Sequence, residues 1–265
     1  MSEYQMGGRK NRGCRNNLLI INGIIHEVLS KKKNSPVLLQ IYDYRQMFDA
    51  IGLEEAISDA FDVGMDDDNL SLIYNANKKI QMAVNTPSGL TERQTLKNVV
   101  LQGDTWSSLL ASIQVDNICK DIVSSGYGYR YKDVLPVSLL ALVDDMIGVT
   151  YAGHRAQQMN VALNVKTAEK RLQFGVNKCK AMIVGKNHEK VMDNPIMVDK
   201  WKVEYLEDYE NNEANGNIGQ LENNHKISET YDGEVKMEKT ERQKYLGFIL
   251  SARGDNMDNI NDMKN

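Results

Sequence analysis

Two short apolar runs, each followed at once by acidic side chains, constrain the fold of this chain most. The first run, VLLQIY at 37–42, ends at Asp43, and the second, SLLALV at 138–143, ends at Asp144 and Asp145. Each run has the length and composition of a buried strand. A carboxylate that is buried without a partner is costly, so these acids must be solvated, capped or bound to a cation.

Helical spacing between and after these runs gives the order of the elements. Apolar residues recur at intervals of 4, 3 and 4 within 107–124 and again within 154–172, which predicts two helices. The two stripes are Ala111, Val115, Ile118 and Ile122, and Val161, Val165, Ala168 and Leu172. A further strand is expected at 181–184. The order strand, helix, strand, strand, helix, strand predicts an α+β fold with a ferredoxin-like split βαβ sheet.

The remaining segments read as additions to this sheet. Residues 18–29 are expected to form an amphipathic helix or a pair of strands, and helices are expected at 50–62 and from the acidic caps at 66–69 onward. The TPSG sequence at 86–89 favours a turn between two antiparallel strands, which predicts a finger-like hairpin over 78–100. Two further apolar segments after residue 195 indicate a small additional sheet.

The carboxylates at the strand ends suggest a cation site. In the split fold, the first strand and the Asp144 hairpin are neighbours at the centre of the sheet, so Asp43 and Asp144 are expected to meet. A hard divalent cation such as Mg²⁺ relieves the repulsion between them, and a pair of such ions can clamp the oxygens of a phosphoryl transfer. Because side chains alternate along a strand, Asp145 is expected to be a secondary ligand. The competing interpretation is a polar hairpin turn without further function.

Charge is distributed unevenly along the chain. The whole sequence has 32 basic and 36 acidic side chains, a net charge of -4, which argues against a uniformly basic nucleic-acid coat. However, segments 1–33 and 166–190 each carry seven Lys or Arg against two acids. These two basic segments are the predicted contacts with nucleic-acid phosphates.

Cysteine usage and hydropathy bear on the compartment. The three cysteines are widely spaced and form no C-x-x-C pair, so a reducing compartment fits best. No run of 18 apolar residues and no secretory signal is present in the sequence. We therefore expect an intracellular protein, cytoplasmic or nuclear, with no membrane partner.

Five short motifs, in a fixed order, resemble those of a known family. They are D-x-x-x-x-F-D from Asp43 through Phe48 to Asp49, Gln102-Gly103 before a helix, Leu142-Val143-Asp144-Asp145, Phe174-Gly175-Val176-Asn177-Lys178-Cys179-Lys180, and Tyr245-Leu246-Gly247. In this order the motifs resemble those of reverse transcriptases, and within them the type carried by non-LTR retrotransposons. The order of five motifs is more specific than any one of them.

The resemblance implies a polymerase palm and an RNA-directed DNA polymerase activity. It implies two Mg²⁺ ions, with Mn²⁺ as an alternative, at Asp43, Asp144 and Asp145. It also implies that the partners are an RNA template, a DNA primer and a dNTP.

The resemblance assigns roles to further residues. Phe48 would exclude a ribose 2′-OH by its bulk, and Lys178, with Lys180 as the alternative, would donate a proton or a positive charge to the leaving pyrophosphate. Gln102 and Gly103 would lie against the template or the nucleotide. The primer grip would be Tyr245, Leu246 and Gly247.

The same resemblance predicts how the chain is divided. Residues 1–35 are expected to be a remnant of the fingers that contacts the template, and 36–190 the palm, with the finger-like hairpin inserted at 78–100. Residues 191–265 are expected to form a small β region with the primer grip and a polar tail. With partial fingers and little or no thumb, the chain is expected to be a truncated domain.

Two other functions remain open from the sequence. A catalytically inactive retroelement remnant would keep the palm and at most bind nucleic acid. A metal-dependent hydrolase could use the same carboxylates, although no His or Glu constellation accompanies them.

Overall fold

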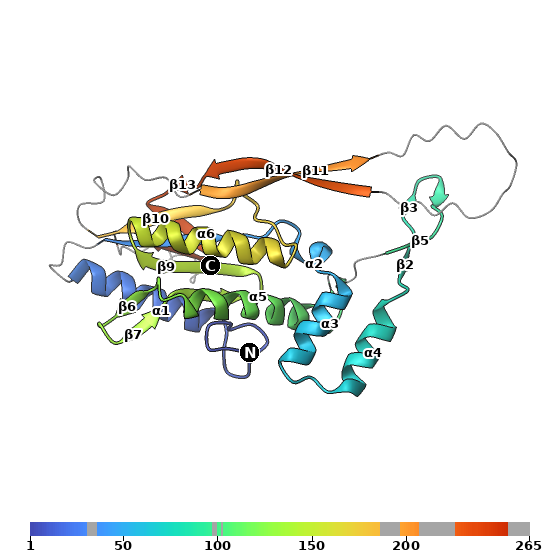
Figure 1. The fold of residues 1–265 in the computed structure, drawn as a ribbon, viewed down its shortest axis with the longest axis horizontal. Coiled ribbons are helices and arrows are strands. Elements are labelled where there is room, and N and C mark those ends of the chain that lie inside the picture. Colours follow the sequence, from blue (N-terminus) through green and yellow to red (C-terminus); the bar gives the residue numbers. More distant parts are fainter. Residues whose placement is uncertain (31–35, 97–99, 102, 186–196, 207–225, 254–265) are drawn as a thin grey trace, which may run out of the picture.

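The computed structural model describes residues 1–30, 36–96, 100–101, 103–185, 197–206 and 226–253 of the chain (Figure 1). The helices in this part are α1 (Cys14–Ser30), α2 (Met47–Ala50), α3 (Leu53–Asp62), α4 (Asp67–Asn77), α5 (Ser107–Ser124) and α6 (His154–Glu169). The segment 18–29 is therefore a helix rather than a pair of strands. The helix predicted at 107–124 is confirmed, and the one predicted at 154–172 begins as predicted and ends at Glu169. Asp66 caps α4 by accepting a hydrogen bond from the Asn69 amide at 3.0 Å.

A five-stranded sheet in the order β13-β10-β1-β9-β8 forms the centre of the molecule. Its strands are β1 (Val37–Tyr42), β8 (Leu139–Leu142), β9 (Asp145–Tyr151), β10 (Lys180–Val184) and β13 (Glu238–Lys239). β1 lies between β9 and β10 and is antiparallel to both. In chain order, α5 lies between β1 and β8, and α6 lies between β9 and β10. This is the predicted ferredoxin-like split arrangement, with β13 added in parallel at the edge.

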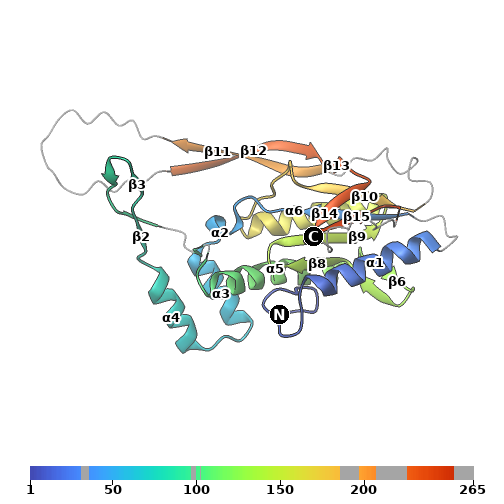
Figure 2. The ribbon, with the colours of Figure 1, turned by 180° about the vertical axis from the view of Figure 1, so that it is seen from behind.

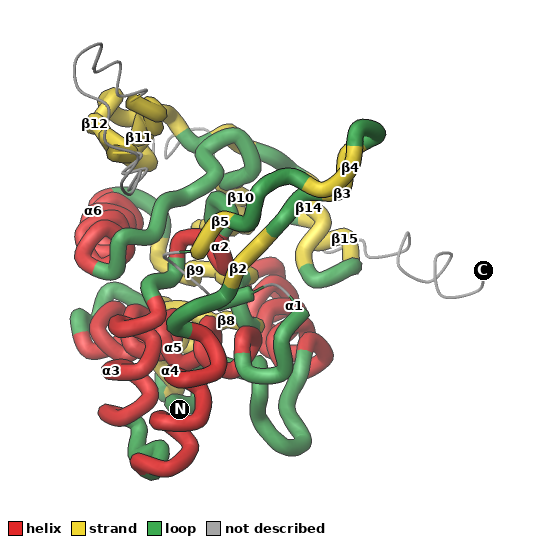
Figure 3. Tube along the Cα trace, turned by 90° about the vertical axis from the view of Figure 1, so that its right-hand side faces the viewer, coloured by secondary structure: helices red, strands yellow, loops and turns green. Residues whose placement is uncertain are grey.

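Both faces of the sheet are covered, which explains why all six residues of β1 are buried. Figure 3 shows α5 and α6 on one face, and α1 with the hairpin of β14 (Arg242–Tyr245) and β15 (Phe248–Ser251) on the other. Along β1, Leu38 and Tyr42 join the core on the α5 and α6 face, while Leu39 and Ile41 join the core under α1. The view from behind in Figure 2 shows α1 crossing in front of β8 and β9.

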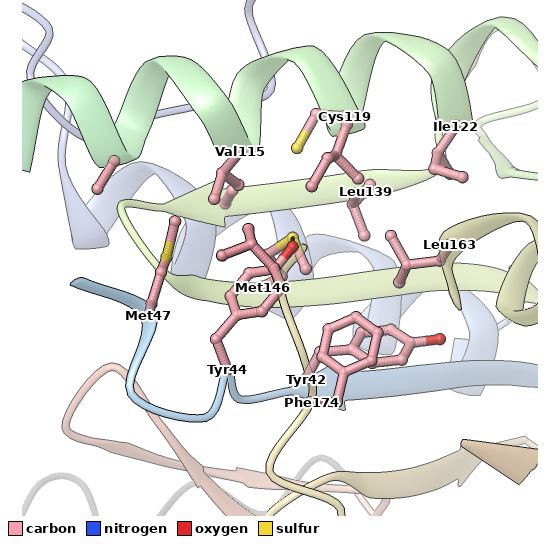
Figure 4. Close-up of a cluster of buried hydrophobic side chains, with 14 of the residues drawn as sticks. Tyr42, Tyr44, Met47, Val115, Cys119, Ile122, Leu139, Met146, Leu163 and Phe174 are labelled. Atoms are coloured by element: carbon pink, nitrogen blue, oxygen red, sulfur yellow. Dashed lines mark hydrogen bonds between the residues drawn. The ribbon is translucent and has the colours of Figure 1, made fainter. Parts of the chain in front are cut away.

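The buried stripe of α5 is the predicted one, since Ala111, Val115, Ile118 and Ile122 are all buried against the sheet. Figure 4 shows Val115, Cys119 and Ile122 pointing from α5 toward Leu139, above Met146 on the next strand.

The predicted stripe of α6 is wrong. Val161 and Val165 are 48% and 51% exposed, and the helix instead buries Ala156, Met159, Asn160, Leu163, Asn164 and Thr167. The reason is a polar patch on the sheet below it. The Gln40 amide donates to the Ala156 carbonyl at 3.2 Å, and the Tyr42 hydroxyl lies 2.9 Å from the Asn160 side-chain oxygen. An apolar periodicity cannot reveal a helix face that is selected by buried hydrogen bonds.

The finger-like hairpin extends from the end of α4 (Figure 1). It consists of two short ladders, β2 (Gln81–Met82) with β5 (Gln94–Thr95), and β3 (Asn85–Thr86) with β4 (Gly89–Leu90). The turn lies at the predicted TPSG sequence. The hairpin carries exposed apolar side chains, including Leu90 at its tip.

Two further hairpins and the N-terminal segment accompany the central sheet. β6 (Tyr129–Tyr131) and β7 (Leu135–Val137) form a small hairpin before β8, and β11 (Met197–Leu206) pairs with β12 (Lys226–Lys236). At the N-terminus, Gln5 forms a parallel bridge with Ala141 of β8. The division at residues 35 and 190 stays a prediction, although β13 extends the palm sheet. Within the described ranges, no helix is both long and apolar enough to cross a bilayer.

Candidate active site

Asp43 follows the last residue of β1 and is fixed there by the chain around residue 175. The Gly175 amide donates to the Asp43 carbonyl at 2.8 Å, and the Arg45 amide donates to the Gln173 carbonyl at 2.8 Å. Phe174 stacks on Tyr44 with ring centroids 5.0 Å apart and also contacts Tyr42 at 5.0 Å (Figure 4). Each such aromatic pair contributes about 0.5–1.5 kcal/mol beyond its buried area. Two aromatic residues that flank Asp43 thus anchor the loop that carries Lys178.

Lys178 lies directly beside Asp43. Its Nζ is 3.1 Å from Asp43 Oδ1, and its side chain is 72% exposed while that of Asp43 is 34% exposed. A tight turn sets this position, since the Lys178 amide donates to the Gly175 carbonyl at 2.7 Å. A Cβ on Gly175 would lie 3.3 Å from Asp43 Oδ1, so the absence of a side chain there leaves room for the carboxylate.

The hairpin between β8 and β9 carries the other two carboxylates. Leu142 pairs with Asp145, so Val143 and Asp144 form a two-residue turn. Val143 adopts a φ of 59°, a left-handed conformation that costs an L-residue about 1–2 kcal/mol. A β-branched residue in this conformation is unusual and must be held by its surroundings.

The register of β1 and β9 decides which carboxylate faces Asp43. Tyr42 pairs with Met146, so the next step beyond the ladder brings Asp43 opposite Asp145. Asp145 accordingly lines one cleft with Asp43, whereas Asp144 is half-buried in the turn. The expected meeting of Asp43 with Asp144 stays a prediction, and in the structure Asp145 is the carboxylate that lines the cleft together with Asp43.

The three carboxylates and Lys178 interact electrostatically. Partial desolvation, followed by the charges of Asp144 and then Asp43, raises the pKa of Asp145, while Lys178 opposes this rise. Burial also raises the pKa of Tyr44, with a small contribution from Asp144. A cluster of this kind, with like charges gathered at one edge of a sheet, is typical of a functional site.

The cleft has a volume of about 370 Å³ and is formed by four segments that are far apart in the sequence. They are residues 41–43, Asp145, the loop with Asn177, Lys178 and Lys180, and residues 243–246 of the β14–β15 hairpin. The predicted primer-grip residues Tyr245 and Leu246 are therefore next to the carboxylates. Leu246 and Gly247, with φ values of 51° and 82°, form the turn of that hairpin.

Tyr245 connects this turn to the core beneath it. Its ring is buried under α1, and burial raises its pKa, with a further contribution from the charge of Asp145. The sequence predicts that Tyr245 belongs to the primer grip, and this role stays a prediction; in the structure Tyr245 lines the same cleft as Asp145.

The other predicted site residues lie outside this cleft. Phe48 is half-buried in α2 and packs against the main core. Gly103 is exposed in a turn just before α5, with a φ of 97° and open space around its Cα. Gln102 lies outside the described residues. Their assigned roles stay predictions.

Sequence reasoning missed several residues of the site. Gln243 and Lys244 line the cleft, and only their position next to the Tyr245 motif could have indicated this. Lys180, considered only as an alternative to Lys178, also lines the cleft and pairs with Glu238 of β13. Gln5, which contacts the turn at Val143, had no sequence signal.

Carboxylate oxygens are the type of donor that a hard divalent cation prefers. The cleft edge offers carboxylates, and Asp43 Oδ1 is shielded from solvent and accepts no hydrogen bond within the described part of the chain. Its charge is met by the ammonium of Lys178 instead. As the side chains lie, no three or more His, Cys, Asp or Glu of the described ranges are close enough to hold a metal ion.

Comparison with solved structures supports the fold. Telomerase from Candida tropicalis, in complex with a TWJ fragment of telomeric RNA, matches with a TM-score of 0.50 and 16% identity, over 69% of this chain and 31% of that one. The match thus spans about a third of that telomerase chain. Apo telomerase from the same organism, truncated from its C-terminal domain, matches 95% of this chain and 40% of that one with a TM-score of 0.43 and 13% identity.

Comparison with protein families identifies the chain. No curated protein matches it. The family model described as reverse transcriptase (RNA-dependent DNA polymerase) matches residues 1–250, a span that contains all the strands of the palm sheet and every segment of the cleft. The chain therefore belongs to the reverse transcriptase (RNA-dependent DNA polymerase) family.

Proposed function

We propose that this chain is the polymerase palm of a non-LTR retrotransposon reverse transcriptase and that it extends a DNA primer on an RNA template. In this reaction the primer 3′-OH attacks the α-phosphate of a dNTP and pyrophosphate leaves. One observation carries the proposal. Asp43, Asp145, Lys178 and the 245–247 turn come from four distant segments and surround a single cleft.

Asp43, Asp144 and Asp145 are the residues that would hold Mg²⁺, with Mn²⁺ as an alternative. When bound, two such ions would neutralise the charge on the attacking and leaving oxygens. Contacts within the chain position the carboxylates and set their charge. The backbone around Gly175 fixes Asp43. Burial, followed by the charges of Asp144 and Asp43, raises the pKa of Asp145, so the cluster favours a positive charge nearby.

Lys178 supplies a mobile positive charge at the same place. Its side chain is mostly exposed, and among the described residues Asp43 is the one ion-pair partner of its ammonium, so the ammonium can turn from Asp43 toward a phosphate. There it would offset the charge on the leaving pyrophosphate or give it a proton. The ion pair seen here is then the resting position of the side chain.

The neighbouring turn at 245–247 suits the end of a primer. Leu246 lines the cleft together with Asp145, and the turn belongs to a hairpin that is packed under α1. A rigid turn beside the carboxylates would keep the primer 3′ end within reach of them.

The phosphates of the nucleic acid are expected to contact basic side chains that remain exposed to solvent. In the segment 166–190, Lys166 pairs with Asp121 and Glu169, Lys170 with Asp59, and Arg171 with Glu55. Among the described basic residues of that segment, Lys180 also pairs with Glu238. Lys178 pairs with Asp43 but is 72% exposed beside the cleft, so it is the best placed phosphate contact among them. Residues 1–33 and the base of the hairpin, where Lys78 and Lys79 lie, are the other candidates.

The test is extension of a labelled DNA primer on an RNA template with dNTPs and Mg²⁺. Extension is expected for the chain as it stands, and Asp43→Asn and Asp144→Asn are each expected to abolish it, with Asp121→Asn as a surface control. Extension that survives Asp43→Asn would refute the assignment. Binding of the primer and template without extension would favour the inactive remnant, and nuclease activity that depends on Asp43 would favour the hydrolase.

A further inference from the structure

Gln5 is completely buried although it lies in the N-terminal segment before α1. Its side chain reaches across to the turn that carries Asp144. The Val143 amide donates to Gln5 Oε1 at 2.9 Å, and Gln5 Nε2 donates to the Val143 carbonyl at 3.1 Å. The side-chain amide of Gln5 thus pairs with both backbone polar groups of one residue, as a neighbouring strand would.

The rest of the Gln5 amide is also satisfied. Its Oε1 accepts a second hydrogen bond from the Gly7 amide at 2.8 Å, and its Nε2 has a longer contact to the Ser112 carbonyl of α5 at 3.5 Å. The side chain therefore connects the turn to the N-terminal segment and to α5. A buried amide with these partners is held in a single orientation.

The backbone on both sides of Gln5 is fixed to the strand that leads into the turn. The Ala141 amide donates to the Tyr4 carbonyl at 2.8 Å, and the Met6 amide donates to the Ala141 carbonyl at 2.9 Å. Asn17 of α1 donates to the same carbonyl at 3.1 Å. Gly7 lies so close to the turn that a Cβ on it would be only 2.8 Å from the Val143 nitrogen.

Val143 needs such support, since it is a β-branched residue with a φ of 59°. We propose that Gln5 is a positioning residue that holds the Val143 turn in this conformation and thereby sets the direction of Asp144 and Asp145. The inference rests on the proposed polymerase function for its consequence in catalysis, but the support of the turn is a property of the chain itself. Gln5 touches neither substrate nor carboxylate and acts through Val143.

The chain provides a matched control in another hairpin. Glu27 of α1 is also buried and accepts from the Lys132 amide at 3.0 Å with both oxygens. Lys132 likewise has a positive φ and lies in the β6–β7 turn. Gln5→Met and Glu27→Met each keep the approximate side-chain volume and remove the hydrogen bonds to one left-handed turn, but only the first turn carries carboxylates.

Amide hydrogen exchange tests the support of the turn without any activity. In Gln5→Met the Val143 amide is expected to exchange about tenfold faster, the effect of losing one hydrogen bond, while the Lys132 amide is unchanged. Glu27→Met is expected to give the reverse pattern. Unchanged exchange at Val143 in Gln5→Met would overturn the inference, whether or not the protein polymerises.

Primer extension tests the consequence for catalysis. Gln5→Met is expected to lower kcat by about 10–100-fold, as loss of a supporting residue does, with little change in KM for the dNTP. Gln5→Glu, which keeps the acceptor for the Val143 amide, should recover part of kcat, and Glu27→Met should leave it near wild type. Wild-type kcat in Gln5→Met would overturn the positioning role. Absence of extension by the wild-type chain would refute the proposed function instead, and the exchange experiment would then decide the inference alone.

A second pair of variants covers the case in which Gln5→Met does not fold. Gly7→Ala pushes a methyl group against Val143, whereas Gly13→Ala adds the same group where no atom lies within 4 Å. Gly7→Ala is expected to raise Val143 exchange and lower kcat, and Gly13→Ala to change neither. Equal behaviour of the two variants would contradict the inference.

Discussion

Replacing Lys178 by Ala separates the catalytic part of the site from its structural part. The substitution removes an ion pair with a 3.1 Å separation between Nζ and Asp43 Oδ1, in which the lysine is 72% exposed. Solvent screens such a pair, so its loss should cost about 0.2–1 kcal/mol of unfolding free energy. For a chain of this size that is a Tm decrease of about 4 °C or less.

The expected effect on catalysis is much larger. A group that donates a proton or a charge in the transition state contributes about 10²–10⁴-fold to the rate, so Lys178→Ala should slow nucleotide addition by at least about 100-fold. Loss of Lys178 also removes the charge that opposes the raised pKa of Asp145, so that pKa should rise further. The carboxylates then repel one another more strongly.

Single-nucleotide extension under saturating dNTP, with thermal unfolding followed by circular dichroism, measures both effects. Lys166→Ala is the control, because Lys166 forms ion pairs with Asp121 and Glu169 at 3.2 and 2.8 Å, away from the cleft. It should show a similar small change in Tm and a wild-type rate. The reasoning is refuted if Lys178→Ala extends the primer within about threefold of wild type, well inside the 10²–10⁴-fold range of a catalytic group. An unfolding cost above about 2 kcal/mol would show instead that the residue is mainly structural.

Two further predictions concern stability. Asp145→Asn should stabilise the fold at neutral pH. The folded chain raises the pKa of Asp145, so the stability of the wild-type chain falls as pH rises through that pKa. In urea unfolding from pH 3 to 8, the stability gained by Asp145→Asn should therefore vanish at low pH. A gain in stability that is constant with pH would contradict this cause. Tyr42→Phe removes a buried hydroxyl that lies 3.0 Å from Gln40 Oε1 and 2.9 Å from the Asn160 side chain, and should cost about 1–3 kcal/mol in the same assay; an unchanged urea midpoint would show that the hydroxyl contributes nothing.

Much of the fold follows from local sequence patterns. The apolar run at 37–42 and the 4, 3, 4 spacing in 107–124 depend on periodicities that each element carries within itself, and both predictions are confirmed. The helix at 154–169 shows what such a local periodicity does not determine. It begins as predicted and ends at Glu169, and the face it buries contains Asn160, because Tyr42 and Gln40 present polar groups to it. A partner that lies more than 100 residues away cannot be read from the helix alone.

The same distinction between local sequence patterns and tertiary structure holds for the candidate site. The sequence by itself determined that Asp43, Asp144 and Asp145 stand at strand ends, since a carboxylate is costly in a buried strand without a partner. Only the tertiary structure decided that Asp145 is the residue opposite Asp43, because this depends on the register of two strands. It also brought Lys178 to Asp43 through Phe174, and Gln5 to Val143, since packing on both faces of one sheet joins segments that the sequence keeps apart.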